Sequence, residues 1–223
     1  NTISDISHQL KTPLAALNIY NGIIQTEAEA KELSEVQEFS ALSEQELDRI
    51  ETLVQNLLKI AKFDAGTIAI ERKSENLAEM MADVRKRFLF RATQEGKEIA
   101  LAGSESLSFF CDRYWIVEAV GNIVKNALDH TDSGDVVRII WGQSASVVHI
   151  TVQDNGKGIC PEDLHHIFKR FYRSRYSKDT QGIGLGLPLA KSVVEAHNGT
   201  IEVDSWLGEG TAFDLSFLIP TKM

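Results

Sequence analysis

The sequence predicts an α+β protein in two parts, an antiparallel helical hairpin followed by an α/β sandwich. The first 63 residues repeat apolar side chains at spacings of three and four, as long amphipathic helices do. Beyond residue 66, helical and strand patterns alternate, and of the 15 glycines only Gly22 lies before that point. We therefore expect two domains, a hairpin at 1–65 and a sandwich at 66–223.

Two helices are expected in the first domain, at residues 2–30 and 36–63. The second carries apolar residues that alternate in spacing between three and four: Leu47, Ile50, Val54, Leu57 and Ala61. Because a single hairpin buries too little apolar surface, we expect a homodimer in which two hairpins form a four-helix bundle. The alternative is a monomer whose hairpin packs back on residues 67–223.

The second domain is expected to place helices over one face of a sheet. The predicted helices are 77–94, 114–130 and 187–196. The predicted strands are 67–71, 98–102, 107–111, 136–142, 147–153, 201–205 and 210–218.

The composition narrows the possible functions. The chain has 223 residues and a formal net charge of −9, and it contains no dense run of Lys and Arg, so direct binding to nucleic acid is not expected. No apolar run reaches the roughly 18 residues of a membrane span. Cys111 and Cys160 form neither a Cys-x-x-Cys pair nor a His/Cys spacing that would bind zinc. This favours a soluble chain in a reduced, cytosolic environment. Because a helical pattern is already running near Asn1, we expect a fragment of a longer protein.

His8 is the first candidate for chemistry. At about 100° per residue, the apolar residues of this segment share one side of the helix and His8 and Thr12 lie nearly opposite. Those apolar residues are Ile3, Ile6, Leu10, Leu14 and Leu17. A projecting imidazole is better suited to a nucleophile than to a core residue.

Asn122 and Asn126 lie four residues apart on one helix face, with Glu118 one turn earlier. Amide oxygens beside a carboxylate suit Mg²⁺, which takes the rest of its shell from water and phosphate. The alternative is that the asparagines are solvated or capping residues.

Asp154 follows an apolar strand and precedes Gly156 and Gly158. Spaced glycines let the backbone approach a flat ligand closely, and a buried carboxylate accepts from an exocyclic amine such as that of adenine. The alternative is a strand-ending turn.

A second glycine cluster opens a helix, where backbone N–H groups and the helix dipole favour phosphate. It comprises Gly182, Gly184, Gly186 and Leu187. The pattern is neither G-x-G-x-x-G nor a P-loop. The alternative is that part of the cluster hinges a mobile segment.

Residues 159–181 contain no glycine but several cations and aromatic residues, which is typical of a lid that closes on phosphates. We expect Arg170 or Arg173 to contact phosphate. The alternative is an exposed loop anchored by its aromatic side chains.

In this order, the motifs resemble those of the sensor histidine kinases of two-component signalling, over essentially the whole chain. Residues 7–14 resemble the H box, 122–127 the N box, 154–158 the first glycine box, 167–171 the F box, 182–187 the second glycine box and 208–211 the last. The resemblance implies a dimerisation and phosphoacceptor hairpin followed by a Bergerat-type ATP-binding domain.

By this resemblance, His8 accepts the γ-phosphoryl group of ATP and passes it to an aspartate in the receiver domain of a response regulator. Thr12 would orient water for the reverse, phosphatase reaction. Asn122 and Asn126 would hold Mg²⁺, Asp154 would recognise adenine, and residues 159–181 would form the ATP lid. Thr211 belongs to the last glycine box. The chain would be the cytoplasmic portion of a membrane sensor, attached through a region upstream of it.

Two positions depart from the family. Gln9 stands where an acidic residue is usual; an amide can orient the imidazole but cannot take its proton, so solvent or a phosphate oxygen is expected to do so. Asp129 and His130 replace a Lys and an aromatic residue; His130 could still contact the base, which leaves phosphate binding to Arg170 or Arg173.

The exposed face below His8 presents Thr12, Ala15 and Ile19, which we expect to dock a receiver domain; the alternative is ordinary surface exposure. Two other functions stay open. One is an ATPase or chaperone-like member of the same superfamily, in which Glu118 activates water. The other is a nucleotide-sensing scaffold without turnover.

Overall fold

The computed structural model describes residues 12–24, 33–174 and 183–219, with the side chains of the second range described from residue 36. The chain forms two compact units, Asn1–Lys59 and Ile60–Met223.

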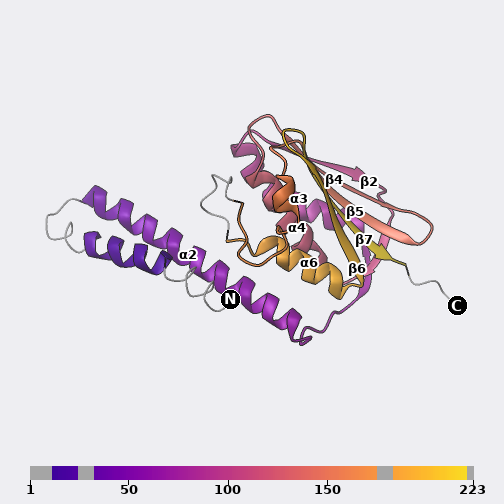
Figure 1. Ribbon diagram of the computed structural model, residues 1–223, viewed down its shortest axis with the longest axis horizontal. Helices are drawn as coiled ribbons and strands as arrows, with labels where there is room; N and C mark the ends of the chain where they lie inside the picture. Colours follow the sequence, from indigo (N-terminus) through magenta and orange to yellow (C-terminus); the bar gives the residue numbers. More distant parts are fainter. Residues whose placement is uncertain (1–11, 25–32, 175–182, 220–223) are drawn as a thin grey trace. The chain divides into compact units, whose positions relative to one another are not determined.

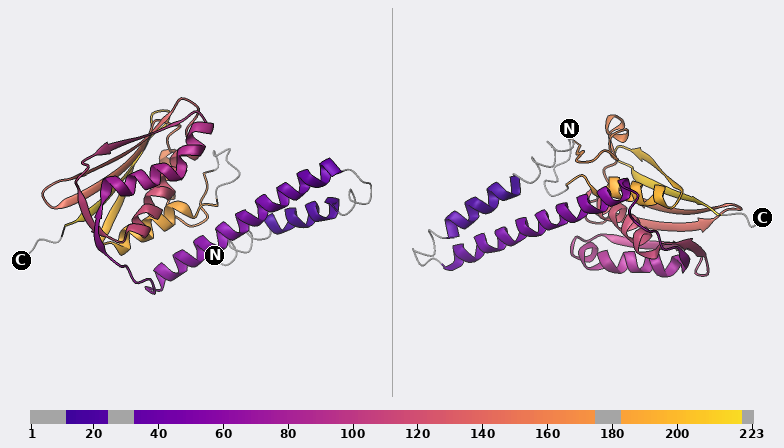
Figure 2. Two further views of the ribbon diagram at one scale, coloured as in Figure 1. Left: turned by 180° about the vertical axis from the view of Figure 1, so that it is seen from behind. Right: turned by 90° about the horizontal axis from the view of Figure 1, so that it is seen from below.

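The first unit contains two helical stretches, as predicted. Residues 12–24 are helical, and α2 (Leu33–Asp64) runs for 32 residues, its last turn belonging to the second unit. The two stretches lie side by side (Figures 1 and 2), with the rings of Tyr20 and Phe39 6.0 Å apart. Leu17 and Leu53 are buried.

The second unit is built on a five-stranded sheet with the strand order β2-β4-β5-β7-β6. Only the β2–β4 pair is parallel among these neighbours. The strands are β2 (Glu98–Gly103), β4 (Val136–Gln143), β5 (Val147–Asp154), β6 (Gly199–Trp206) and β7 (Gly210–Leu218).

Three helices cover one face of this sheet (Figure 1), which confirms the predicted α+β sandwich. They are α3 (Leu77–Gln94), α4 (Arg113–Asp129) and α6 (Gly186–Ala196). Alternate strand residues such as Ile139, Ile150 and Leu215 are fully buried, as expected for strands with one covered face.

Two of these helices, α3 and α4, start at side-chain caps. The carboxamide oxygen of Asn76 accepts from the backbone N–H of Glu79, and the Asp112 carboxylate accepts from that of Trp115. Such caps satisfy donors that the helix itself leaves unpaired, and they fix where α3 and α4 begin.

The strand predicted at 67–71 is wrong. Residues 67–72 have no regular structure, and the strand β1 (Lys73–Asn76) instead pairs with β3 (Ser108–Cys111) in a separate two-stranded sheet. Two hydrogen bonds hold residues 71 and 72 against the ends of helices. The Glu71 N–H donates to Asp112 before α4, and the Arg72 guanidinium donates to the carbonyl of Ala196 at the end of α6.

Candidate functional site

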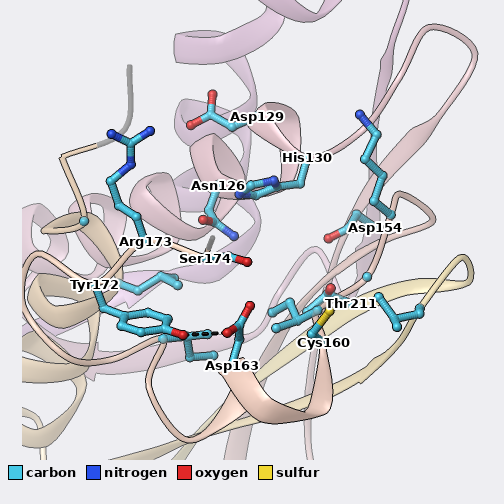
Figure 3. Close-up of a pocket in the computed structure, with 17 residues that line it drawn as sticks. Asn126, Asp129, His130, Asp154, Cys160, Asp163, Tyr172, Arg173, Ser174 and Thr211 are labelled. Atoms are coloured by element: carbon cyan, nitrogen blue, oxygen red, sulfur yellow. Dashed lines mark hydrogen bonds between the residues drawn. The ribbon is translucent and has the colours of Figure 1, made fainter. Parts of the chain in front are cut away.

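A cavity of about 430 Å³ lies where the ends of α4 and β5 meet the start of α6 and the β6–β7 turn (Figure 3). The short helix α5 (Pro161–Leu164) also contributes to its wall. The predicted nucleotide-binding residues that line it are Asn126, His130, Asp154, Gly158, Arg173, Gly184, Leu187 and Thr211.

Asp154 is a buried acceptor at the end of β5, only 6% exposed. One carboxylate oxygen accepts from the Gly156 N–H at 2.9 Å. Burial raises the pKa of Asp154, while hydrogen bonds from the Gly156 and Thr211 backbones and the nearby charge of His130 oppose that rise. These contacts leave a fixed, strongly polar acceptor facing the cavity, as recognition of an amine requires.

Two glycines allow the β6–β7 turn to approach Asp154. Gly158 has φ +69, and a Cβ there would lie 2.1 Å from the carbonyl oxygen of Trp206. Gly210 has φ +115, and a Cβ there would lie 2.0 Å from the carbonyl oxygen of Asp154. Any side chain at either position would push the turn, and Thr211 with it, away from the cavity.

Asn126 lines the cavity, and Asn122 lies one turn earlier on α4. The amide nitrogen of Asn122 donates to the Glu118 carbonyl, while its Oδ1 lies 3.0 Å from the Cβ position of Gly186 at the start of α6. The Asn122 amide oxygen therefore lies near the start of α6, and Asn126 faces the cavity one turn later; amide oxygens suit an ion that keeps water and phosphate ligands.

Glu118 lies outside the cavity lining. Its carboxylate pairs with the Arg87 guanidinium at 3.1 Å, so in this structure it faces α3. Across the part of the chain that the structure describes, no group of three or more His, Cys, Asp or Glu residues could hold a metal ion. An ion at this site would therefore depend on the asparagines and on the ligand's own oxygens.

The start of α6 presents backbone N–H groups without a side-chain cap. Gly184 has φ +73, and its carbonyl accepts from the Phe171 N–H at 2.9 Å, which ties residue 171 of the predicted lid (159–181) to the chain just before α6. A Cβ at Gly184 would lie 2.6 Å from the carbonyl oxygen of Tyr172.

The two predicted phosphate-binding arginines have different surroundings. Arg173 lines the cavity. Arg170 donates to both carboxylate oxygens of Asp64 at 2.7 Å and does not line it. Of the two, Arg173 is the residue that the fold places where a ligand could reach it.

Asp129 and His130 both line the cavity. The Asp129 carboxylate is held by Arg91 and by Lys125, each at 2.8 Å. The carbonyl oxygen of His130 lies 2.4 Å from the Cβ position of Gly156. Gly156 is not itself in the lining, but its missing side chain allows this close contact beside Asp154.

Several further residues line the cavity without having been singled out as site residues: Lys157, Ile159, Cys160, Asp163, Ile167, Tyr172, Ser174 and Leu207. All but Lys157 and Leu207 belong to the predicted lid (159–181), and Lys157 belongs to the predicted first glycine box, but their spacing carries no periodic signal that would identify them individually. His8, Gln9 and Gly182 lie outside the described residues, whereas Thr12 is described and exposed.

The fold and the cavity define a nucleotide-binding α+β domain that follows a helical hairpin. Residues 1–66 match the family model of the His Kinase A (phospho-acceptor) domain. Residues 111–221 match that of the histidine kinase-, DNA gyrase B-, and HSP90-like ATPase.

Individual relatives agree. The chain is 31% identical over 217 residues to the sensor histidine kinase YvrG of Bacillus subtilis (strain 168), covering 96% of this chain and 37% of YvrG. Full-length ShkA, solved in complex with AMPPNP, is 25% identical with a TM-score of 0.73, covering 85% of this chain and 40% of ShkA. ThkA in complex with the response regulator protein TrrA is 21% identical and shares the fold, with a TM-score of 0.74, covering 97% of this chain and 60% of that one.

The chain belongs to the sensor histidine kinases, the enzymes of two-component signalling, and carries their phosphoacceptor and ATP-binding domains. It spans little more than a third of YvrG. Among the residues that the structure describes, no helix has the length and apolar character needed to cross a membrane.

Proposed function

We propose that this chain uses ATP bound in the second unit to phosphorylate His8, and then passes the phosphoryl group to an aspartate of a response regulator. The observation that carries the proposal is the buried Asp154 carboxylate in a cavity that Arg173 also lines. An acceptor for the adenine amine and a cation for the phosphates are two recognition elements that suit ATP.

In the reaction, a neutral imidazole nitrogen of His8 attacks the γ-phosphorus of ATP, the bond to the ADP oxygen breaks and ADP leaves. Imidazole has an ordinary pKa of about 6.5 and needs no strong base, so alignment and charge neutralisation provide most of the rate. Gln9 orients the ring, and the proton leaves to solvent or to a phosphate oxygen.

Asp154 accepts from the adenine amine, with Thr211 and His130 beside it. Arg173 and the N–H groups at the start of α6 bind phosphate oxygens. Asn122 and Asn126 would hold Mg²⁺, which supplies positive charge to the phosphates when bound. The similar protein ShkA was solved in complex with AMPPNP, which supports nucleotide binding by this chain.

The active form is a homodimer. Three apolar side chains of α2, Leu47, Val54 and Leu58, are 56%, 40% and 56% exposed in a single chain. Burying them against a second hairpin would remove this apolar surface from water. The measurement is sedimentation equilibrium: Leu47→Lys with Val54→Lys should give monomers, and a wild-type monomer would contradict this proposal.

The receiver domain of a response regulator is the proposed partner, by analogy with the ThkA–TrrA complex. Thr12 and Ile19 lie exposed on the first described helix and belong to the docking face. Thr12 would orient water for dephosphorylation.

Since the chain covers 37% of YvrG, a sensor histidine kinase, we also propose that it is the cytoplasmic portion of a membrane sensor.

The test is incubation of the chain with γ-labelled ATP and Mg²⁺, beside His8→Gln. We expect label on the wild type that is acid-labile and base-stable, and none on the variant. Equal labelling of both would refute the assignment of His8. Phosphate release without labelled protein would instead indicate the ATPase alternative, which the Glu118–Arg87 ion pair disfavours because it occupies the proposed base. Nucleotide binding with neither activity would indicate a sensing scaffold.

A further inference from the structure

Asp163 and Tyr172 form a hydrogen-bonded pair in the nucleotide cavity (Figure 3); both lie in the predicted lid, but the sequence assigned neither of them a role. The Tyr172 hydroxyl donates to Oδ1 of Asp163 at 2.5 Å. Asp163 comes from α5 and is only 8% exposed, and both residues line the cavity. Because Asp163 is buried, leaving its acceptor oxygen without a donor would be costly, so the hydrogen bond from Tyr172 is a firm attachment point.

Further contacts fix the chain around Tyr172. The His166 ring lies 5.3 Å from the Tyr172 ring, and the Tyr172 N–H donates to the Lys169 carbonyl at 3.2 Å. Phe171 adopts φ +60, an unfavourable conformation for a bulky side chain, and its N–H donates to the Gly184 carbonyl. Such a conformation persists only where the surroundings hold it, which indicates that the path of the chain here is tightly constrained.

Arg173 and Ser174 follow directly and both line the cavity. In Figure 3, Arg173 lies on the side of the cavity away from Asp154. Since consecutive Cα atoms are about 3.8 Å apart, the place of Tyr172 determines where the Arg173 side chain starts. A shift of about 1 Å in a binding group is enough to weaken its interaction substantially.

We propose that Asp163 is a positioning residue that acts through Tyr172 to direct the Arg173 guanidinium at the phosphates of ATP. This inference rests on the proposed function, in which Arg173 binds phosphate. The acceptor oxygen of residue 163 is the required feature, whereas its charge is secondary.

The experiment measures the dissociation constants of ATP and adenosine, with Mg²⁺ present, for the whole chain. Tyr172→Phe removes one oxygen, and Asp163→Leu removes the acceptor at similar size; each should weaken ATP binding about tenfold. Asp163→Asn keeps an acceptor oxygen and should stay within about threefold of wild type, while adenosine, which has no phosphate, should bind all variants within about twofold. Tyr114→Phe, at a tyrosine outside this cavity, is the matched control.

Coupling to Arg173 is the decisive measurement. In an Arg173→Gln background, Tyr172→Phe should have no further effect on ATP binding, because the group that it positions is gone. An undiminished effect in that background, or an equal loss of ATP and adenosine affinity, would overturn the inference by showing a general structural role. The failure of the proposed function is a separate result: a wild-type chain that binds ATP but gains no label at His8.

Discussion

Arg91 and Asp129 join the ends of α3 and α4, with the guanidinium and carboxylate 2.8 Å apart. The contact occurs where the family usually has a lysine, and Lys125 approaches the same carboxylate. Asp129 is therefore part of an ion-pair network beside the cavity, and its two cationic partners compensate its charge.

Restoring the lysine that is usual in the family at position 129 should therefore destabilise this protein. Asp129→Lys would place a third cation beside Arg91 and Lys125, and we expect a loss of about 1 to 2 kcal/mol in the free energy of unfolding, limited by solvent screening. Urea unfolding measures it. Asp132→Lys, at an exposed acid that pairs with Lys157 on the surface, is the control and should change stability by less than about 0.5 kcal/mol. An Asp129→Lys protein as stable as the control would contradict the network.

Asp154→Asn should weaken ATP binding while it keeps the hydrogen bonds that Asp154 makes within the fold. Its amide oxygen would accept from Gly156 and Thr211, leaving its NH₂ group against the adenine amine, and we expect at least about tenfold weaker ATP binding. Isothermal calorimetry with ATP measures this, and unchanged affinity would remove Asp154 from the base site.

The same variant should change the pH dependence of folding. Burial raises the pKa of Asp154 above its ordinary value of 3.8, so the folded state binds this proton more tightly than the unfolded state. Its stabilising contribution is full below pH 3.8 and is lost as pH rises through the higher, folded pKa. Asp154→Asn has no such group, and its free energy of unfolding should fall less over that window. Identical pH profiles for the two proteins would show that the pKa is not raised.

The two cysteines should react at very different rates. Cys111 is fully buried, and burial raises the pKa of its thiol to about 12, whereas Cys160 is half-buried and lines the cavity. Iodoacetamide should therefore alkylate Cys160 first, and ATP should slow the reaction. Peptide mass spectrometry locates the label, with Cys160→Ser as the control. Label at Cys111 in the folded protein, or no effect of ATP, would contradict the geometry.

Lys97 should stabilise the domain by capping the C-terminal end of α4. Its side chain is 8% exposed, and its ammonium group donates to the Leu128 carbonyl at 2.7 Å and pairs with Glu95 at 2.5 Å. A cation at a helix C-terminus compensates both the unpaired carbonyl and the dipole. Lys97→Met should cost about 1 to 3 kcal/mol in the free energy of unfolding, and the exposed Lys86→Met on α3 almost nothing. Equal effects would show that the cap does not stabilise the domain.

Strong helical periodicity made the helices of the sandwich predictable. The predicted helix 77–94 matches α3. Helix α4 begins and ends one residue earlier than predicted, and α6 begins one residue earlier. β1 was missed because it depends on pairing with β3, which lies more than thirty residues later. A strand with half-exposed residues has no alternating pattern of its own to read.

The buried acceptor and the glycines of the cavity were predictable because a motif places them consecutively, as with Asp154, Gly156 and Gly158. Asp163, Cys160 and Leu207 reach the cavity only through tertiary packing. Likewise the ion pair of Glu118 with Arg87, and that of Arg170 with Asp64, join residues far apart in sequence. Helix periodicity alone could not reveal these pairs.

The pairing of Asp154 with Thr211 across β5 and β7 has a kinetic consequence. The β4–β5 and β6–β7 pairs join consecutive strands, but β5 and β7 are separated along the chain by α5, α6 and β6. Closing such a long loop is entropically slow compared with forming a local hairpin. The capacity to capture ATP should therefore arise late during refolding, so that a fluorescent nucleotide would report the moment at which the sheet is complete.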